Sequence, residues 1–290
     1  MSIKIAVLLT CFNRKDLTLT CLEILNKQQS ENLIIEIYLV DDGCTDGTGD
    51  AVRSKFTNVN VILGNGHLYW NGGMRLAWES ALPSKPDFYL WINDDSFLYK
   101  DAISNLLQCF NDLNDQNKSI GVLLGSMVDP ITKELTYGGR LRSHGMNPLK
   151  IGSVVLPKDE PQKCDFINGN LILIPSNTVE RIGILSNKFT HSMGDFDYGL
   201  RAAKAGLDCW VAPGVYGECE KNPIEGTWQD KSLDLDERIK KTKSITQLPP
   251  LEEWKYFVKS HGGAYWGLIY FDAWLRDTFP KIWFRLRRKL

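Results

Sequence analysis

Apolar runs of strand length alternate with segments of helical period through the first half of this 290-residue chain. The pattern predicts strands at residues 3–9, 33–40, 59–63, 88–92 and 120–124, and helices at residues 17–29, 48–56, 74–82 and 102–113. Repeated strand–helix–strand units favour a mostly parallel sheet with helices on both faces. We therefore expect an α/β fold that binds its ligands beyond the carboxyl ends of the strands.

The second half of the chain departs from this alternation. Glycines between residues 138 and 152 indicate hairpins or a mobile loop, a buried strand is predicted at residues 166–174, and the next helix begins in the segment GDFDYGLRAAKAG. From Glu218 onward the chain is polar and charged, and it ends in an aromatic segment of helical character. We expect a main domain at residues 1–220 and a partly helical C-terminal extension at residues 221–290, with a basic and aromatic end.

The composition excludes several classes of protein. With 43% hydrophobic and 24% charged residues, the chain is an ordinary globular sequence and not a disordered, collagen-like or disulfide-rich one. Its seven cysteines are odd in number and have no CxxC spacing, which favours reduced thiols in the cytoplasm. The first apolar stretch is too short for a signal peptide, and no run approaches the roughly 18 apolar residues of a membrane span. These features predict a cytoplasmic protein.

Charge is distributed unevenly along the chain. The net charge is −1, but the last ten residues, KIWFRLRRKL, contain five basic residues and no acid, so the first 280 carry 29 basic and 35 acidic residues. Aromatic and basic side chains interleave toward this end: Phe271, Trp274, Phe279, Trp283 and Phe284 with Arg276, Lys281, Arg285, Arg287, Arg288 and Lys289. The pattern predicts a helix on an anionic membrane surface, or alternatively a terminal helix whose rings pack on the main domain. No RNA- or DNA-binding motif accompanies it, and we expect no nucleic-acid partner.

Polar clusters follow three of the predicted strands: TCFNR at residues 10–14, DDGCTDGT at 41–48 and NDDS at 93–96. In a parallel sheet these clusters converge on one edge. Adjacent aspartates repel each other unless hydrogen-bond donors or a cation offset their charge, and Mg²⁺ or Mn²⁺ is commonly shared between carboxylates and substrate phosphates. We therefore expect Asp42 to contact a nucleobase, Asp94 and Asp95 to meet a ribose and a metal ion, and Asp41 to support the turn.

Other nucleotide- and metal-binding motifs do not fit. The segment DDGCTDG lacks the D-x-D-x-D-G order of a calcium loop, and GNGHLYWNGG is not a GxGxxG turn between a first strand and its helix. No GxxxxGK[ST] segment is present, which argues against a P-loop NTPase.

Six motifs in sequence order resemble those of the inverting family 2 glycosyltransferases of GT-A fold, in particular a rhamnosyltransferase-like bacterial branch. They are TCFNR, VDDGCTDGT, GNGHLYWNGG, LWINDDS, FINGNLILIP and GDFDYGLRAAKAG. The resemblance covers about the first 220 residues. It implies a GT-A fold, a nucleoside-diphosphate sugar as donor and Mn²⁺ or Mg²⁺ as cofactor.

The resemblance also implies roles for particular residues. The donor nucleotide would contact Thr10, Phe12, Asn13, Arg14, Asp42 and Asp94. Asp95 matches the metal-binding aspartate of the DxD-type motif, and Asp195 matches the general base. Three positions depart from the family pattern: Ile92 and Asn93 replace the first aspartate of the DxD motif, Gly194 replaces a glutamate, and Cys219 stands near the place of a histidine that often follows the last strand.

Further candidates come from residue chemistry. His67, Trp70 and Arg75 are candidates for contact with the donor sugar or phosphates, because aromatic faces suit sugar C–H surfaces; alternatively, residues 67–73 form a loop whose rings cover the sheet. His191 is a candidate for the acceptor cleft, and Asp197 and Arg201 are either supporting site residues or an i,i+4 helix pair. Asp95 and Asp195 could alternatively cap helices, Cys219 could be a packed thiol, and His261 is expected to be solvated or a helix cap.

Together these observations predict a metal-dependent transfer of a sugar from a UDP- or dTDP-sugar to a hydroxyl of a saccharide or a lipid-linked saccharide. The expected setting is bacterial surface polysaccharide synthesis, in the cytoplasm and at the inner face of the cell membrane. Two alternatives stay open: a sugar-nucleotide-binding protein without turnover, and a sugar-phosphate nucleotidyltransferase.

Overall fold

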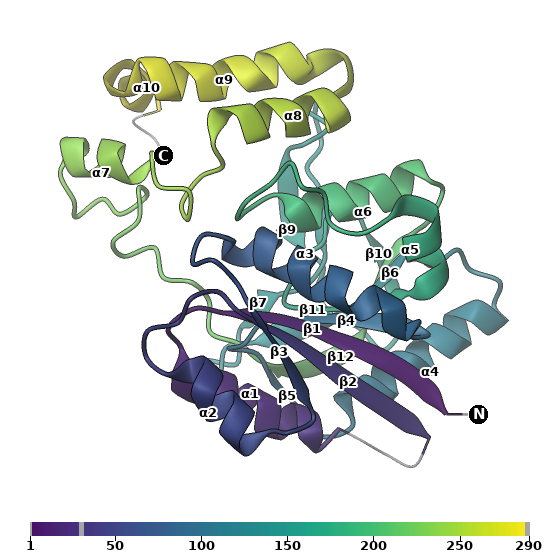
Figure 1. Cartoon of the computed structure of the whole chain (residues 1–290). Coiled ribbons are helices and arrows are strands. Elements are labelled where there is room, and N and C mark those ends of the chain that lie inside the picture. The colour runs from purple at the N-terminus through teal and green to yellow at the C-terminus, as the bar shows by residue number, and fades with distance from the viewer. Residues whose placement is uncertain (1, 29–31, 288–290) are drawn as a thin grey trace.

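One large sheet organises the protein (Figure 1). The computed structural model describes residues 2–28 and 32–287, and within them ten strands join this sheet. They are β1 (Ile3–Cys11), β2 (Leu33–Asp41), β3 (Val59–Leu63), β4 (Phe88–Ile92), β5 (Phe97–Leu98), β6 (Val122–Val128), β7 (Leu135–Tyr137), β10 (Gln162–Cys164), β11 (Leu171–Pro175) and β12 (Cys209–Glu218). A separate two-stranded sheet pairs β8 (Arg140–Arg142) with β9 (Ile151–Val154).

The sheet is mostly parallel, as predicted. Its main path runs β10-β12-β6-β11-β4-β1-β2-β3. β1 pairs in parallel with both β2 and β4, β2 pairs in parallel with β3, and β6 pairs in parallel with β12. β11 is antiparallel to its neighbours β4 and β6. The carboxyl ends of β1, β2 and β4 therefore lie at one edge, where the three polar clusters follow them.

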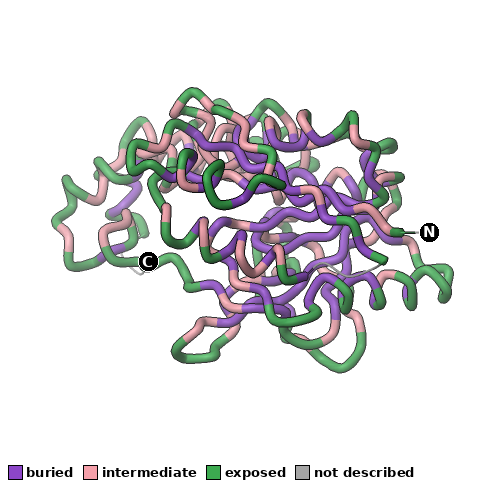
Figure 2. Tube along the Cα trace, turned by 60° about the horizontal axis from the view of Figure 1, so that its bottom comes forward, coloured by how far each residue is buried: buried purple, intermediate pink, exposed green. Residues whose placement is uncertain are grey.

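Helices cover both faces of the sheet. Figure 1 shows α3 (Tyr69–Ala81), α5 (Ser176–Ile182) and α6 (Gly194–Lys204) on one side of it, and α1 (Lys15–Asn26), α2 (Thr48–Lys55) and α4 (Ala102–Asp115) on the other. The sequence of β1 explains this double cover. Ile5, Val7 and Leu9 belong to the core against α1, α2 and α4, whereas Ala6 and Leu8 belong to the core against α3 and α6. Figure 2 shows the buried residues gathered along these strands.

Several predicted boundaries were wrong. The helix predicted at residues 74–82 begins at Tyr69, so the segment expected to form a donor pocket or a loop is partly helical. The buried strand predicted at residues 166–174 is shorter, because β11 covers only Leu171–Pro175. The glycine-containing region does contain paired strands, β8 and β9.

In the described residues, four α-helices follow β12: α7 (Leu235–Lys241), α8 (Leu251–His261), α9 (Trp266–Thr278) and α10 (Pro280–Leu286). α8 packs on α6 through a third core cluster, in which Phe257 and Val258 meet Phe189 and Leu200. Thr190 adds polar contacts, because its backbone N–H and hydroxyl both donate to the Glu253 carboxylate, at 3.1 and 2.7 Å. None of the helices in the described part of the chain is long and apolar enough to cross a membrane.

A buried polar contact also joins α8 to α6. His261 Nε2 lies 2.8 Å from Asp197 Oδ1, and both side chains are only 2% exposed, so the expectation that His261 is solvated or a helix cap was wrong. Arg201 Nε donates to Asp197 Oδ2 at 2.8 Å, which confirms the predicted helix pair. Burial opposes ionisation of Asp197, but the His261 hydrogen bond and the Arg201 charge outweigh it and lower the pKa of this carboxyl.

We predict that His261→Ala lowers the free energy of unfolding by about 2–3 kcal/mol, because it removes a buried partner of a charged carboxylate. Because the pKa of Asp197 is lower in the folded protein than in the unfolded chain, the contribution of its native contacts is present above about pH 4 and is lost at lower pH. Urea unfolding at pH 7.5 and below pH 4 measures both effects. His144→Ala, at an exposed position, is the control, and an equal change in the two variants would contradict the prediction.

Candidate active site

A cavity of about 1220 Å³ lies beyond the carboxyl ends of β1, β2 and β4. Nine of the predicted site residues line it: Thr10, Phe12, Arg14, Asp42, His67, Trp70, Asp95, His191 and Asp195. Six others do not: Asn13, Asp41, Arg75, Asp94, Asp197 and Arg201. The strand ends thus bring most of the predicted residues together, and the remaining ones support them from behind or lie elsewhere.

Asp42 fixes the loop that leads into α3. Its Oδ1 accepts a hydrogen bond from the N–H of Gly66 at 2.8 Å, and its Oδ2 accepts from those of Leu68 and Tyr69 at 2.9 and 3.0 Å. The side chain is almost fully buried and still lines the cavity. Asp41 behaves as the expected turn support, since its Oδ1 accepts from the N–H of Cys44 at 2.9 Å.

Asn13 ties the loop after β1 to the loop after β2. Its Oδ1 accepts hydrogen bonds from the N–H of Thr45 at 2.7 Å and of Asp46 at 3.3 Å. The backbone of Asn13 has a φ of 52°, a left-handed conformation that asparagine tolerates better than most residues. Asn13 therefore shapes the edge of the cavity without lining it.

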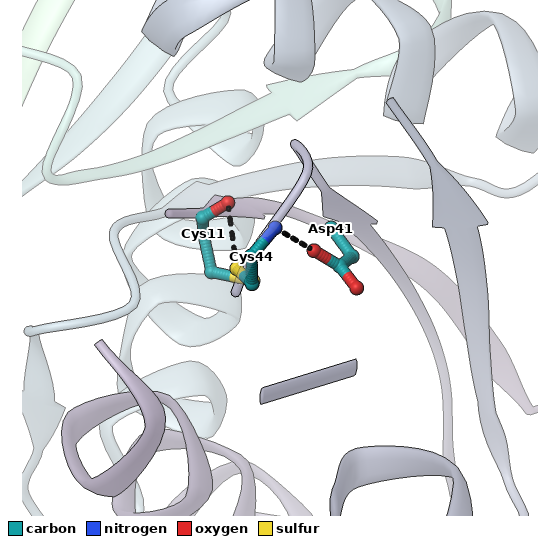
Figure 3. Close-up of side chains that lie close together, drawn as sticks. All are labelled: Cys11, Asp41 and Cys44. Carbon is teal, nitrogen blue, oxygen red and sulfur yellow. Dashed lines mark hydrogen bonds between the residues drawn. The ribbon is translucent and has the colours of Figure 1, made fainter. Parts of the chain in front are cut away.

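Cys11, Asp41 and Cys44 lie close together beneath the same loops (Figure 3). The two sulfur atoms are 3.8 Å apart, and Cys44 Sγ also contacts the Cys11 carbonyl at 3.7 Å. Burial raises the pKa of both thiols, which keeps them protonated near neutral pH. Protonated thiols are poor ligands, and sulfur is a poor match for Mg²⁺ or Mn²⁺, so this cluster does not fit the expected cofactor.

Arg14 forms ion pairs with both Asp94 and Asp95. Its guanidinium contacts Asp94 Oδ1 through one nitrogen and Asp95 Oδ2 at 2.6 Å through another. Thr18 Oγ1 also donates to Asp94, at 3.1 Å. Asp94 is completely buried, and this burial, only partly offset by the Arg14 charge, raises its pKa to about 6. Asp94 therefore holds Arg14 in place from behind the cavity wall.

Asp95 is the residue that could hold a divalent cation. Its side chain is 28% exposed and lines the cavity. Magnesium and manganese commonly bind one or two protein carboxylates and take further ligands from substrate phosphates and water, so a single accessible carboxylate fits such an ion. Cys219 Sγ lies 3.7 Å from Asp95 Oδ1, but burial raises the pKa of this thiol to about 12, which fits the packed-thiol alternative better than a metal ligand.

Asp195 lies in the first turn of α6 and lines the cavity. Its carboxylate accepts hydrogen bonds from the N–H of Gly169 at 3.1 Å and of Phe196 at 2.8 Å. Burial outweighs these bonds and raises the pKa of Asp195 to about 6. No cation of the described residues lies within ion-pair distance of it. A carboxyl with a pKa near neutrality, facing a cavity, suits proton transfer.

The helix-cap alternatives for the two aspartates fail. Met193 occupies the N-cap position of α6, so Asp195 lies inside the helix. Asp95 is followed by the short strand β5, and the next helix, α4, has Asp101 at its N-cap.

Aromatic side chains from the start of α3 form part of the cavity wall. Trp70 Nε1 donates to Asn93 Oδ1 at 2.8 Å. The Trp70 ring packs closely against the backbone of Gly169, because a Cβ at position 169 would lie only 2.3 Å from this ring. Tyr69 contacts the ring of His191 edge-on, with 6.0 Å between the centroids, and burial lowers the pKa of His191. Arg75 instead pairs with Glu79 at 2.7 Å on α3 and does not reach the cavity.

The sequence did not reveal the contribution of the C-terminal extension to the cavity. Residues 221–229 line one part of its wall, together with Thr246 and Gln247. This segment has neither hydrophobic periodicity nor a chemical motif, and it lies at the site because it follows β12, the strand that pairs with β6.

A steric constraint explains why position 194 is a glycine. A Cβ there would lie 1.8 Å from Asn71 Oδ1. Asn71 is completely buried, and its Nδ2 donates to the carbonyls of Ser186 at 3.0 Å and Phe189 at 2.6 Å. The asparagine of the YWNGG segment thus occupies the space that a larger side chain at position 194 would need.

Residues 6–136 match the family model described as Glycosyl transferase family 2. The match covers the strand ends that carry Asp42 and Asp95, and it comprises less than half of the chain. A comparison with curated proteins gave no match.

Solved structures with a similar fold include a mannosyltransferase and a protein solved with UDP-GlcNAc. A Pyrobaculum calidifontis mannosyltransferase, solved with GDP-Man and Mn²⁺, has a TM-score of 0.54 and 16% identity over 89% of this chain and 65% of its own. S. aureus TarS, residues 1–349, has a TM-score of 0.52 and 15% identity over 75% of this chain and 60% of its own. Its complex with UDP-GlcNAc has a TM-score of 0.55 and 14% identity over 89% of this chain and 71% of its own. The chain thus spans less than two thirds of the first two structures. These likenesses, with the strand order above, confirm the GT-A fold.

We predict that Gly194→Ala lowers the free energy of unfolding by about 2–3 kcal/mol, because Asn71 must move and lose its two buried hydrogen bonds. Chemical denaturation measures the loss. Gly267→Ala is the matched control, since a Cβ at that exposed helix position would have no atom within 4 Å. The double variant Asn71→Ala/Gly194→Ala should lose less than the sum of its single changes. Equal stability of Gly194→Ala and Gly267→Ala would refute the steric explanation.

Proposed function

We propose that this protein is an inverting glycosyltransferase that moves a sugar from a nucleoside-diphosphate donor to a hydroxyl of a saccharide or lipid-linked saccharide. The observation that carries the proposal is a single cavity lined by the strand-end loops, the accessible carboxylate of Asp95 and the near-neutral carboxyl of Asp195. The family match over residues 6–136 supports it, and so do neighbours of similar fold that bind GDP-Man or UDP-GlcNAc.

In the proposed reaction, Asp195 accepts the proton of the acceptor hydroxyl. The acceptor oxygen forms the new bond to the anomeric carbon while the bond from that carbon to the diphosphate oxygen breaks, which inverts the configuration. Asp95 would hold Mn²⁺ or Mg²⁺, which when bound neutralises charge on the leaving diphosphate. Arg14 lies directly beside Asp95 and adds a positive charge to the same part of the cavity.

The finer parts of the proposal concern the donor, the acceptor and the setting. We propose that the donor is a UDP- or dTDP-linked sugar, and a rhamnosyl donor is the first to test. We also propose a role in bacterial surface polysaccharide synthesis on the cytoplasmic side of the membrane. The UDP-GlcNAc complex of S. aureus TarS supports a uridine nucleotide.

Contact with an anionic membrane surface through the C-terminal end is part of this proposal, in a modified form. Trp283 and Phe284 are buried and are not available to lipid, but they pack against Trp228 of the extension itself and not, as the packing alternative expected, on the main domain. Phe279, Ile282 and Leu286 are exposed beside Lys281 and Arg285. Arg288 and Lys289, which the sequence also assigned to this surface, lie outside the described residues.

Donor binding tests the proposal most directly. We expect UDP- or dTDP-sugars with Mn²⁺ to stabilise the protein by about 2.7 kcal/mol at a hundredfold excess over Kd. Asp95→Ala should lose the Mn²⁺-dependent part of this shift and the slow donor hydrolysis, whereas Asp115→Ala, an exposed control at the end of α4, should retain both. Binding without hydrolysis or transfer would favour a non-catalytic protein, and pyrophosphate release from NTP and sugar phosphate would favour a nucleotidyltransferase.

Asp195→Asn should lower kcat for sugar transfer by about 10²–10⁴ and leave donor binding intact. In the wild-type protein, kcat/KM should fall about tenfold per pH unit below pH 6, because the carboxyl must be ionised to accept a proton. The pKa is higher in the folded state than in the unfolded chain, so stability falls as the pH rises from about 4 to about 6, and the full cost of the ionised carboxyl is present above pH 6. The variant should therefore melt higher than wild type at pH 7.5. Turnover that survives the substitution would rule out Asp195 as the base.

A further inference from the structure

A second cavity, of about 400 Å³, lies within the C-terminal extension, and we call it the basic pocket. Its lining consists of five cationic side chains, three aromatic ones and a leucine: Lys231, Arg238, Lys281, Arg285, Arg287, Trp228, Trp283, Phe284 and Leu235. It contains no carboxylate. Five cationic side chains outnumber the two carboxylates, Asp236 and Asp272, that pair with them from outside the lining, and this excess of positive charge favours an anion.

The aromatic side of the basic pocket is tightly packed. The rings of Trp228 and Trp283 have centroids 5.8 Å apart, and those of Trp283 and Phe284 are 5.1 Å apart. Arg238 joins α7 to this group, because its guanidinium lies 4.8 Å from the centre of the Phe284 ring and its Nε donates to the Trp228 carbonyl at 2.9 Å. These contacts hold the pocket in one shape before any ligand arrives.

Part of the positive charge is available to a ligand. Lys281 pairs with Asp236 at 3.1 Å, and Arg287 pairs with Asp272 at 2.6 Å. No carboxylate of residues 2–28 or 32–287 lies within ion-pair distance of Lys231 or Arg285, and both of these side chains are exposed. Phosphate is the anion that suits several cations arranged around one cavity, because it accepts multiple charge-assisted hydrogen bonds.

Trp228 connects the basic pocket to the proposed active site, because it lines both cavities. A ligand with a saccharide in the larger cavity and a phosphate in the smaller one would pass beside this ring. The exposed Leu235 and the half-buried Trp228, next to the cations, also suit an apolar chain attached to the phosphate.

We propose that the basic pocket binds the phosphate group of a lipid and thereby positions an acceptor saccharide at the active site. Two kinds of lipid offer such a phosphate. One is a lipid carrier, whose phosphate or diphosphate links it to a saccharide, and the other is an anionic phospholipid, whose headgroup contains a phosphate. The positioning of an acceptor rests on the proposed glycosyl transfer, whereas the binding of phosphate does not depend on it.

The test uses the full chain and two double variants of equal charge. Lys231→Gln/Arg285→Gln removes two pocket cations that have no ion pair in the described part of the chain. Lys118→Gln/Lys150→Gln removes two exposed cations that line neither cavity. Titration calorimetry with inorganic pyrophosphate and with farnesyl diphosphate, in saturating UDP and Mn²⁺ to occupy the active site, measures binding of free and lipid-linked phosphate. Flotation with phosphatidylcholine vesicles, with and without phosphatidylglycerol, measures headgroup binding.

We expect the pocket variant to bind farnesyl diphosphate or phosphatidylglycerol vesicles about tenfold more weakly than wild type, and the control variant to match wild type. Loss confined to farnesyl diphosphate identifies a lipid-linked phosphate, and loss confined to vesicles identifies a headgroup. Equal binding by both variants, with equal melting temperatures, would overturn the proposal. Donor hydrolysis should be the same in all three proteins. The absence of both donor hydrolysis and sugar transfer from all of them would refute the proposed function and leave the result on phosphate binding intact.

Discussion

The position of β1 between β2 and β4 is the constraint on which the site depends. Parallel pairing on both sides places the loops after the three strands at one edge, where their polar residues must share a small space. The pairing persists because β1 is apolar toward both faces of the sheet and is covered by helices on each. Shifting β1 by one residue would exchange these two faces and separate Arg14 from the aspartates that it contacts.

The polar residues at this edge divide into those that hold the loops and those that are open to chemistry. Asp42 binds backbone N–H groups, Asn13 links two loops, and Asp94 holds Arg14 from a buried position. Buried carboxylates need such partners, because burial penalises their charge. Asp195 has backbone hydrogen bonds but no cation within ion-pair distance in the described chain, which leaves its pKa near neutrality. Asp94 has a similar pKa but does not line the cavity, so Asp195 is the near-neutral carboxyl that faces it and is best suited to proton transfer.

The C-terminal extension is held to the main domain by apolar packing and by one buried polar group. Asp197, which the sequence placed among the supporting site residues, contacts His261 of α8 and keeps this helix on α6. Residues 221–229, which follow β12 directly, belong to the wall of the large cavity, and Trp228 lines both cavities.

The sequence by itself determined the α/β class, the parallel strands and the convergence of TCFNR, DDGCTDGT and NDDS, because strand periodicity and the residues after each strand are local patterns. It also suggested Asp95 and Asp195 through their resemblance to known motifs. Only the tertiary structure decided that Asp94 and Arg75 do not line the cavity, that His261 is buried against Asp197, and that the extension supplies a wall and a basic pocket. These contacts join residues far apart in the chain, and their geometry depends on the packing of helices whose sequences carry no signal for it.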